Sequence, residues 1–415
     1  MATNKKIHKL IYYFLLIMPF IDLFSSIATW NNWPSIGLAF KGIFLLFAIL
    51  FLVKNEKKCW KYFIAITIYS IISLWINSQN GSLFQEVSNL IKIFYLPTLI
   101  LYFSNALNPY LNSKLITQIS VLYLLLYLIP YPFNLGHNIS EIYPNKNLYL
   151  SYFYIGNELA NIFILLIPIA FTYLYEQKKK RNLILYSLLV LSMLALLGTK
   201  TMYLSVILIV LFFLYVNRQK VLSTIKKHRS IFLTGFIIGI VGTVIILPKT
   251  AFYQNISTSL DYYKISSIGE LISIENIDNI IYSNRLDFLA NIHQEYIKSP
   301  LINQFFGIGR SKILASKDIE IDIFDIFYSI GIIGFVLYIF YSIFALRQKK
   351  LSMLYKFLLI LLIIISLFSG HVLISPMVST YLALLYGLNE EKKGAKENET
   401  VDQRPIKKIK NRFNA

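Results

Sequence analysis

The sequence predicts an all-α protein that crosses a membrane about twelve times, and three observations carry this prediction. Hydrophobic residues make up 56% of the 415 residues and charged residues only 15%, whereas a soluble domain is about one quarter charged. Apolar runs of about 20 residues, long enough to span a bilayer, recur along most of the chain. These runs are continuous and do not alternate with polar residues. A soluble enzyme, a disordered protein and a β-barrel are therefore excluded.

Each predicted span is an apolar run bounded by polar residues. In chain order the spans cover residues 10–29, 35–53, 62–78, 86–104, 116–132, 155–175, 183–198, 201–217, 231–248, 322–345, 356–371 and 373–388. The first run follows a lysine cluster but lacks a small-residue cleavage site, which indicates a retained helix and not a signal peptide. We therefore expect spans in 1–248, a large external loop in 249–321, further spans in 322–389, and a basic, disordered cytoplasmic tail in 390–415.

The positive charge of the chain sets its orientation. The formal net charge is +19, and most Lys and Arg lie in short segments between the spans. Because positively charged loops stay at the cytoplasmic face, this bias places both termini in the cytoplasm. The same distribution points to membrane lipids as partners and not to nucleic acid. Cys59 is the only cysteine, so no intramolecular disulfide is possible.

The external loop of residues 249–321 keeps aromatic and aliphatic residues throughout, so we expect it to be folded and to offer a sugar platform. Within it, Ser283-Asn284 can cap a helix that ends at Pro300. Three apolar residues share a helical face with Arg285, namely Leu289, Ile292 and Tyr296. We expect this face to pack on the bundle and to place Arg285 over the membrane core.

Ionisable residues inside the predicted spans are functional candidates, because burying a charge in a membrane is costly. They are Asp22, Lys41, Lys92, Glu158, Lys200, Asp322 and Asp325. Lys41 and Lys92 lie near the outer ends of their spans, where they can bind substrate or extend to the surface. Lys200 can point into an external cavity or simply mark a tight hairpin. Glu158 can serve a site or stabilise the start of its helix.

Asp322 and Asp325 are spaced i, i+3 at the outer start of a span, and Ser329 continues the same face. This polar stripe should point into the bundle. Glu320 precedes it, and upstream the run Gly307-Ile-Gly309-Arg310 can expose backbone N–H groups to an anion. Cations expected at the same membrane face are Arg285, Arg310, Lys312 and Lys200. The set suits a pyrophosphate-bearing substrate and a general base, although mutual neutralisation in an external cap would give the same pattern.

The histidines do not indicate a metal site. They are scattered at His8, His137, His228, His293 and His371, without a His-x3-His pair or a cysteine partner. We expect His293 on the exposed side of the loop helix and His371 at the membrane interface. The sequence therefore predicts neither a metal nor a cofactor.

Four stretches of the chain resemble the O-antigen ligase and polymerase superfamily of bacterial cell-surface polysaccharide assembly. They are IGNELANIFILLIPI (155–169), LLGTKTMYLSVILIV (196–210), SNRLDFLANIHQEYIKSPLINQFFGIGRSK (283–312) and DIFDIFYSIGIIGF (322–335). The order of the spans and the large loop before the tenth span resemble the family across most of the chain.

This resemblance implies an inverting, metal-independent glycosyl transfer at the outer face of the bacterial plasma membrane, with an undecaprenyl-diphosphate-linked oligosaccharide as donor. In the family, outer-loop arginines are proposed to hold the diphosphate, and Arg285 and Arg310 are the matching positions. The run Gly198-Thr-Lys-Thr201 resembles a family element with arginine at its third position. Lys200 keeps that charge but loses the bidentate fork.

The chain departs from the ligase pattern at the expected base. Many ligases carry a His-Asn pair shortly before the Gly-x-x-Gly motif that is Gly331-Ile-Ile-Gly334 here, and this chain has Glu320 at that position. A carboxylate can replace imidazole as base; we expect Asp322 first, then Asp325, with Glu320 in reserve. The departure favours a polymerase of capsule, exopolysaccharide or O-antigen repeat units over a ligase that transfers the glycan to a lipid or protein acceptor.

Two other functions compete with a transferase. A lipid-linked oligosaccharide flippase would share the substrate, but a transporter is expected to bind it near the bilayer midplane, whereas the polar residues here gather at the outer edge. A membrane sensor or scaffold would carry a cytoplasmic signalling domain, which the sequence does not show. For the transferase, we expect a flippase and a chain-length regulator as protein partners.

Overall fold

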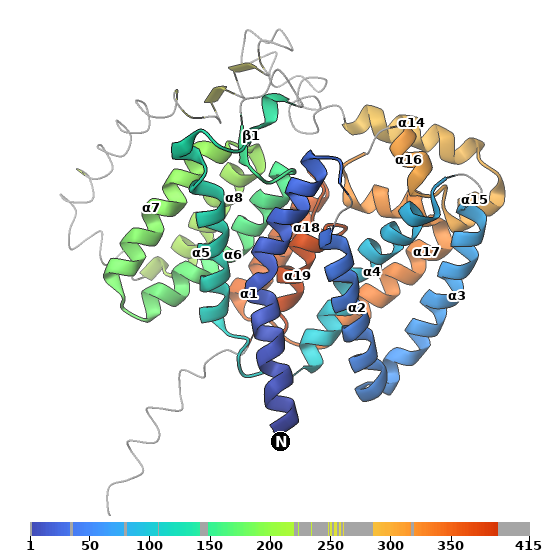
Figure 1. Ribbon diagram of the computed structural model, residues 1–415, viewed down its shortest axis with the longest axis horizontal. Coiled ribbons are helices and arrows are strands. Elements are labelled where there is room, and N and C mark those ends of the chain that lie inside the picture. The colour runs from blue at the N-terminus through green and yellow to red at the C-terminus, as the bar shows by residue number, and fades with distance from the viewer. Residues whose placement is uncertain are drawn as a thin grey trace, which may run out of the picture.

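The computed structural model describes residues 2–33, 36–78, 81–106, 108–141, 148–219, 285–316 and 319–388, together with isolated positions between 223 and 260. Most of the described chain is helical, and the long helices run between the two ends of one bundle (Figure 1). The prediction of an all-α polytopic membrane protein is confirmed. Apart from those isolated positions, the expected ninth span (231–248), the loop before residue 285 and the tail (390–415) lie outside the described residues.

Eight of the described helices are long and apolar enough to cross a membrane. They are α1 (Ala2–Trp30), α2 (Ile36–Asn55), α3 (Trp60–Asn77), α4 (Leu83–Asn105), α5 (Ser113–Leu128), α6 (Gly156–Glu176), α7 (Lys180–Leu197) and α17 (Asp322–Leu346). The shorter helices are α8 (Lys200–Val216), α14 (Arg285–Lys298), α15 (Leu301–Phe306), α16 (Arg310–Ser316), α18 (Met353–Ser366) and α19 (Pro376–Leu384). The connections contain the 3-10 turns η1 (Lys57–Cys59), η2 (Tyr131–Phe133) and η3 (Ile139–Glu141), and an antiparallel pair of strands, β1 (His137–Asn138) and β2 (Tyr149–Ser151).

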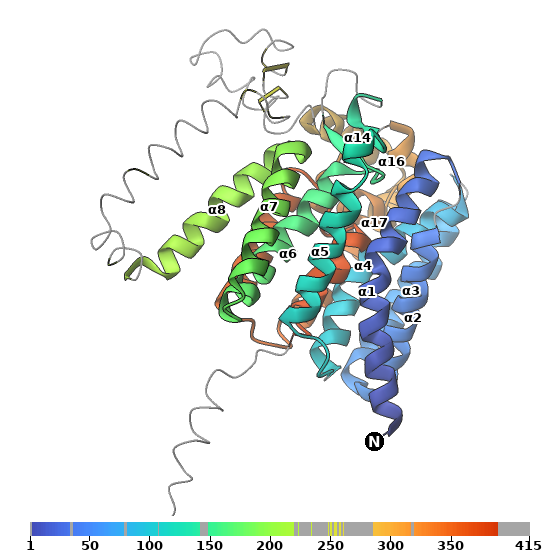
Figure 2. The ribbon, with the colours of Figure 1, turned by 60° about the vertical axis from the view of Figure 1, so that its left-hand side comes forward.

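Helices α4, α6 and α19 form the centre of the bundle. In the most apolar stretches of α4 and α6, 67% and 72% of the residues are buried, compared with 22–33% in α1, α2, α3 and α7. Every residue of α19 is buried, and its Thr380 hydroxyl hydrogen-bonds Tyr95 of α4 at 3.0 Å. Helices α1 to α3 and helices α7 and α8 lie on opposite sides of this centre (Figure 2). The peripheral helices therefore keep the apolar outer surface that contact with lipid requires.

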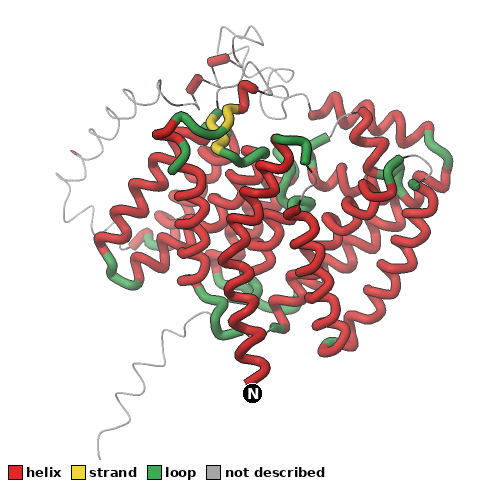
Figure 3. The backbone as a smooth tube through the Cα atoms, viewed as in Figure 1, coloured by secondary structure: helices red, strands yellow, loops and turns green. Residues whose placement is uncertain are grey.

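The strands and α14 to α16 lie at one end of the bundle, opposite the N-terminus (Figures 1 and 3). We call it the outer end, because the charge bias of the loops predicts that it faces outward. Helix α14 begins at Arg285 and ends at Lys298, shortly before Pro300, as the sequence predicts. Its residues Ile292 and Tyr296 are buried, so the expected apolar face does pack on the bundle. The capping pair Ser283-Asn284 lies outside the described residues.

Helix α17 is kinked where the sequence predicts a continuous span. Gly331 adopts φ 64° and ψ −173°, which breaks the helix one third of the way along. The connection between α15 and α16 fills the break, and the Ile308 N–H donates to the carbonyl of Tyr328 at 3.0 Å. A Cβ on Gly307 would lie 2.1 Å from the carbonyl oxygen of Ser329. The glycine at position 307 thus permits a close backbone approach, and the approaching backbone is that of α17.

A second break separates α18 from α19. The sequence predicts spans over 356–371 and 373–388, whereas these helices cover only Met353–Ser366 and Pro376–Leu384. The backbone between them turns through Gly370 and His371, whose φ values are 61° and 59°. Asp322 accepts the N–H groups that this turn leaves outside a helix, from His371, Val372 and Leu373. The break explains why both helices are shorter than the apolar pattern predicts, and it opens the bundle near its outer end.

Candidate functional site

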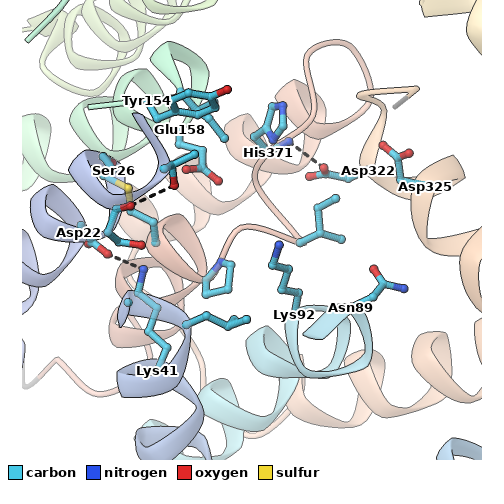
Figure 4. Close-up of a pocket in the computed structure, with 18 of the residues that line it drawn as sticks. Asp22, Ser26, Lys41, Asn89, Lys92, Tyr154, Glu158, Asp322, Asp325 and His371 are labelled. Carbon is cyan, nitrogen blue, oxygen red and sulfur yellow. Dashed lines mark hydrogen bonds and ion pairs between the residues drawn. The ribbon is translucent and has the colours of Figure 1, made fainter. Parts of the chain in front are cut away.

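A cavity of about 360 Å³ lies at the outer end, between α1, α2, α4, α6, α16, α17 and the connection from α18 to α19 (Figure 4). Six of the eight site residues predicted from the sequence line it, namely Lys41, Lys92, Arg310, Glu320, Asp322 and Asp325. The other two, Arg285 and Lys200, are not among the described residues that line it. The cavity therefore gathers cations and carboxylates from segments that are far apart in the sequence.

Asp322, Asp325 and Ser329 form the polar stripe that the sequence predicts on the first turns of α17. Their exposed fractions are 0%, 3% and 3%, so the stripe does point into the bundle. Asp322 is engaged most fully, because its oxygens accept N–H groups from His371 at 2.7 Å, Val372 at 2.8 Å and Leu373 at 2.6 Å. These three bonds indicate that Asp322 stabilises the backbone at the α18–α19 break. They argue against Asp322 as the general base, which is the role that the sequence favours for it.

Glu320 lies just before α17 and is one of the residues that line the cavity. It has a φ of 57°, and its carbonyl oxygen would lie only 2.6 Å from a Cβ on Gly370. Arg285 donates to Glu320 Oε2 from Nη2 at 2.6 Å and from Nε at 3.2 Å, and to the carbonyl of Phe368 at 3.2 Å. The Glu320 side chain is nevertheless 32% exposed. Arg285 thus holds a carboxylate that remains partly exposed, and a strained backbone of this kind is typical of functional sites.

Arg310 begins α16 and lies 3.8 Å from Asp325, measured from Nη1 to Oδ1. The expected anion cradle at 307–310 is occupied by the carboxylate of Glu86 from α4, which accepts the N–H groups of Arg310 and Ser311 at 2.9 and 2.8 Å. The sequence analysis missed Glu86. The signal in the sequence is an acidic residue in the first turn of a long apolar helix, and in the structure this residue is 4% exposed.

Lys41 and Asp22 form an ion pair between α2 and α1, on the opposite side of the cavity from Asp325 (Figure 4). Asp22 also accepts a hydrogen bond from the Tyr123 hydroxyl. The side chains of Lys41 and Asp22 are 8% and 2% exposed, so Lys41 does not extend to the surface. Lys92 of α4 is half-buried and lies between this pair and the carboxylates of α17.

Of the remaining candidates, Glu158 lines the cavity in the first turn of α6, a helix whose N-cap residue, Ile155, supplies no side-chain cap. Lys200 begins α8, where Thr199 caps the helix by accepting the Met202 N–H at 3.4 Å. Lys312 lies in α16 and is half-buried. The hairpin at Lys200 is therefore built as a helix start, and its lysine is a less direct candidate than Lys92.

His371 is a cavity residue whose place the sequence did not predict. We expected it at the membrane interface, but it lines the cavity, half-buried, with its backbone held by Asp322. The signal is Gly370-His371 inside an apolar run that restarts at Ser375-Pro376, a pattern typical of a broken membrane helix. His293 is exposed as predicted, and its Nδ1 lies 3.0 Å from the Tyr328 hydroxyl. Among the described residues, no group of three or more His, Cys, Asp or Glu is arranged to hold a metal ion.

Residues from both halves of the chain line the cavity. The match to a known protein family also covers both halves. The family profile described as O-antigen ligase like membrane protein matches residues 4–270 and 266–389. The chain belongs to this family. No curated protein and no solved structure matches the chain. As a member of this family, the protein is a multi-pass membrane protein. Family membership also supports a glycosyltransferase-like role in glycan processing, in agreement with the resemblance seen in the sequence.

Proposed function

We propose that this O-antigen ligase like protein polymerises undecaprenyl-diphosphate-linked oligosaccharide repeat units at the outer face of the bacterial plasma membrane. The observation that carries the proposal is the cavity in which Arg310, Lys92 and Lys41 lie together with Glu320 and Asp325. Cations next to carboxylates at one end of a membrane bundle suit a reaction that releases a diphosphate and removes a proton.

In the proposed reaction, a hydroxyl oxygen of the acceptor sugar attacks the anomeric carbon of the donor sugar. The bond between that carbon and the diphosphate oxygen breaks, and the electron pair leaves with undecaprenyl diphosphate. The hydroxyl proton passes to a side chain of the protein. A single displacement of this kind inverts the anomeric configuration and needs no metal when side chains supply the positive charge.

Arg310 and Lys92 are the diphosphate ligands that the geometry favours. Arg310 is anchored by its backbone to Glu86, and its guanidinium reaches the cavity beside Asp325. Lys92 comes from the neighbouring α4 and lies between the Lys41–Asp22 pair and the α17 stripe (Figure 4). Lys41 is paired with Asp22, so it would act on the diphosphate less directly than Arg310 and Lys92. Arg285 and Lys200, which we expected among the ligands, would act only indirectly.

Glu320 is the proposed general base. Asp322 accepts three backbone hydrogen bonds, whereas Glu320 lines the cavity, is partly exposed and is held by Arg285. A base must lie within hydrogen-bond reach of the proton that it removes, and a carboxylate at the cavity wall satisfies this requirement for an acceptor bound there. Asp325 is the alternative base, and Asp322 becomes a positioning residue.

A ligase is the second candidate, because His371 brings an imidazole to the cavity although the chain lacks the His-Asn pair of many ligases. The two functions share the donor and differ in the acceptor. Purified protein in lipid nanodiscs, incubated with lipid-linked repeat units alone, distinguishes them. Polymerase activity yields a ladder of lipid-linked chains and free undecaprenyl diphosphate, whereas a ligase yields no ladder until a lipid or protein acceptor is added.

The variants Arg310→Ala and Glu320→Gln test the site in cells as well as in nanodiscs. In a deletion strain complemented with either variant, we expect loss of long polysaccharide chains and accumulation of single lipid-linked units facing outward. Units trapped at the cytoplasmic face would contradict the transferase and identify a flippase. Parent-like ladders from both variants, at equal protein levels, would contradict the assignment of the site.

A further inference from the structure

The cavity has a second wall, formed by α1 and α6, that the proposed reaction does not use. It carries the aliphatic hydroxyl groups of Ser25, Ser26 and Thr29 from α1, the phenol ring of Tyr154 just before α6, and the carboxylate of Glu158. In Figure 4, Ser26, Tyr154 and Glu158 lie close together, on the far side of Lys92 from Asp325. This wall, which we call the α1–α6 wall, is therefore continuous with the reaction site but separate from the α17 stripe.

The ring of Tyr154 is supported by other aromatic rings. Trp30, the last residue of α1, meets Tyr154 edge to face with 4.9 Å between the ring centroids. His137 of β1 stacks on Trp30 at 4.1 Å and 15°. Glu141 lies 2.8 Å from His137 Nδ1 and accepts the Asn138 N–H at 2.9 Å. Partial burial raises the pKa of Glu141, but these hydrogen bonds outweigh it and keep the pKa below its ordinary value. The ring of Tyr154 is thus fixed in place before any ligand binds.

Trp30 also holds a hydrogen-bond donor for which the described residues supply no acceptor. Its indole Nε1 is buried, and no described residue accepts its hydrogen. Trp30 itself is not among the residues that line the cavity, so it contacts the wall through the ring of Tyr154. The C–H face of a sugar ring packs on aromatic rings such as Tyr154, and sugar hydroxyl groups hydrogen-bond side-chain hydroxyl groups and carboxylates such as Glu158. The lining residues of the wall therefore offer both kinds of contact that a sugar ring uses.

The charges of the wall fit an uncharged sugar. Lys41 is paired with Asp22, so those two side chains are neutral as a unit. Glu158 remains as a half-buried carboxylate at the cavity, and its two oxygens can accept hydrogen bonds from adjacent sugar hydroxyl groups. A uronic acid or a phosphorylated sugar would place a like charge against Glu158, which disfavours binding.

We propose that the α1–α6 wall binds one uncharged sugar ring of the glycan, with Tyr154 as the stacking surface and Glu158 as the hydroxyl acceptor. Ser25, Ser26 and Thr29 lie on the α1 side of the same ring. The inference rests on the proposed function, because it deepens the substrate of that site. It places the sugar on one side of Lys92 and the leaving diphosphate on the other.

Trp30 gives a direct measurement of this subsite. The chain has four tryptophans, so replacing Trp33, Trp60 and Trp75 by phenylalanine leaves Trp30 as the only emitter. The first probe is the oligosaccharide released by mild acid from the lipid-linked units that accumulate in a deletion strain. We expect it to change Trp30 emission in a saturable way. A matched reporter that keeps only Trp75, which is 68% exposed on α3, should show no change.

Two variants locate the ring, and a second probe separates the two proposals. In the Trp30 reporter, Glu158→Gln and Tyr154→Leu should raise the half-saturating oligosaccharide concentration about tenfold or more. If they titrate like their parent while unfolding at the same temperature, the subsite assignment is overturned. The second probe is undecaprenyl diphosphate without sugar, whose binding is measured by native mass spectrometry. If it binds while the oligosaccharide leaves Trp30 emission unchanged, the subsite fails and the proposed function stands. If neither probe binds, the proposed function itself fails.

Discussion

The carboxylate of Glu86 in α4 holds the backbone of Arg310 in α16. Glu86 Oε2 accepts the Arg310 N–H at 2.9 Å, and Glu86 Oε1 accepts the Ser311 N–H at 2.8 Å. The carboxylate is 4% exposed, and a Cβ on Gly309 would lie 3.0 Å from Oε1. A buried carboxylate thus occupies the start of α16, so the anion that a substrate brings must meet the Arg310 side chain and not its N–H.

We predict that Glu86→Gln weakens donor binding. The amide keeps one acceptor but turns an NH2 group towards a backbone N–H, and losing such a bond costs about 1–3 kcal/mol. We expect the KM for the lipid-linked donor to rise about tenfold or more, with a smaller change in kcat. Initial rates in nanodiscs over a range of donor concentrations provide the measurement.

The matched control is Gln85→Ala. Gln85 contacts the same segment by accepting the Ser311 hydroxyl at 2.9 Å, but it is exposed and leaves the backbone of Arg310 untouched. It should keep the parent KM. Equal KM values for Glu86→Gln and the parent would show that Arg310 needs no such anchor.

Asp322 and Glu320 should respond differently to loss of charge. Asp322→Asn removes an acceptor from the N–H groups at 371–373 and should destabilise the fold by about 1–3 kcal/mol. Glu320→Gln keeps an amide oxygen that can accept from Arg285, so it should cost less stability than Asp322→Asn, yet lower kcat by about 100-fold or more if Glu320 is the base. Thermal unfolding in detergent and rates in nanodiscs measure the two effects. A stable, inactive Asp322→Asn beside an active Glu320→Gln would reverse the roles.

The buried pair of Asp22 and Lys41 predicts a non-additive mutant cycle. Asp22→Asn leaves the lysine charge without its carboxylate, which costs about 3–5 kcal/mol in a buried site. Lys41→Met leaves the Asp22 carboxylate without its cation and should lower the stability by a similar amount. Because the double variant buries neither charge, it should be more stable than either single variant. Unfolding midpoints of all four proteins test this, and additive losses would mean that the pair is solvated.

Patterns within one helix were predictable from the sequence, because they depend on local periodicity. The apolar runs, the face of α14 that carries Arg285, and the inward stripe of Asp322 and Asp325 are all of this kind. Each needs only the repeat of an α-helix and the cost of exposing a charge to lipid. The fold class and most of the candidate residues were therefore accessible without a structure.

Partnerships between distant segments were not predictable in this way. Glu86 meets Arg310 across 224 positions of the chain, and Asp322 meets the 371–373 turn across about 50. Nothing in the periodicity of α4 or α18 says which segment it will contact. Hydropathy also predicted regular spans at the kink of α17 and at the break between α18 and α19. Apolar residues flank both places, so the hydropathy pattern does not show that the helix stops there.

The kink of α17 makes a final prediction about the glycines. Gly331 has φ 64°, and a Cβ there would lie 2.3 Å from the backbone nitrogen of Gly307. Gly331→Ala should therefore destabilise the protein by about 2–5 kcal/mol, from the left-handed backbone and from overpacking together. In α2, by contrast, a Cβ on Gly42 meets nothing within 4 Å, so Gly42→Ala should be neutral or stabilise the helix by up to about 1 kcal/mol. Unfolding midpoints of the two variants measure the difference. Because the Gly307 connection leads directly into Arg310, Gly331→Ala should also slow glycan transfer; parent-like stability and rate would show that the kink is not required.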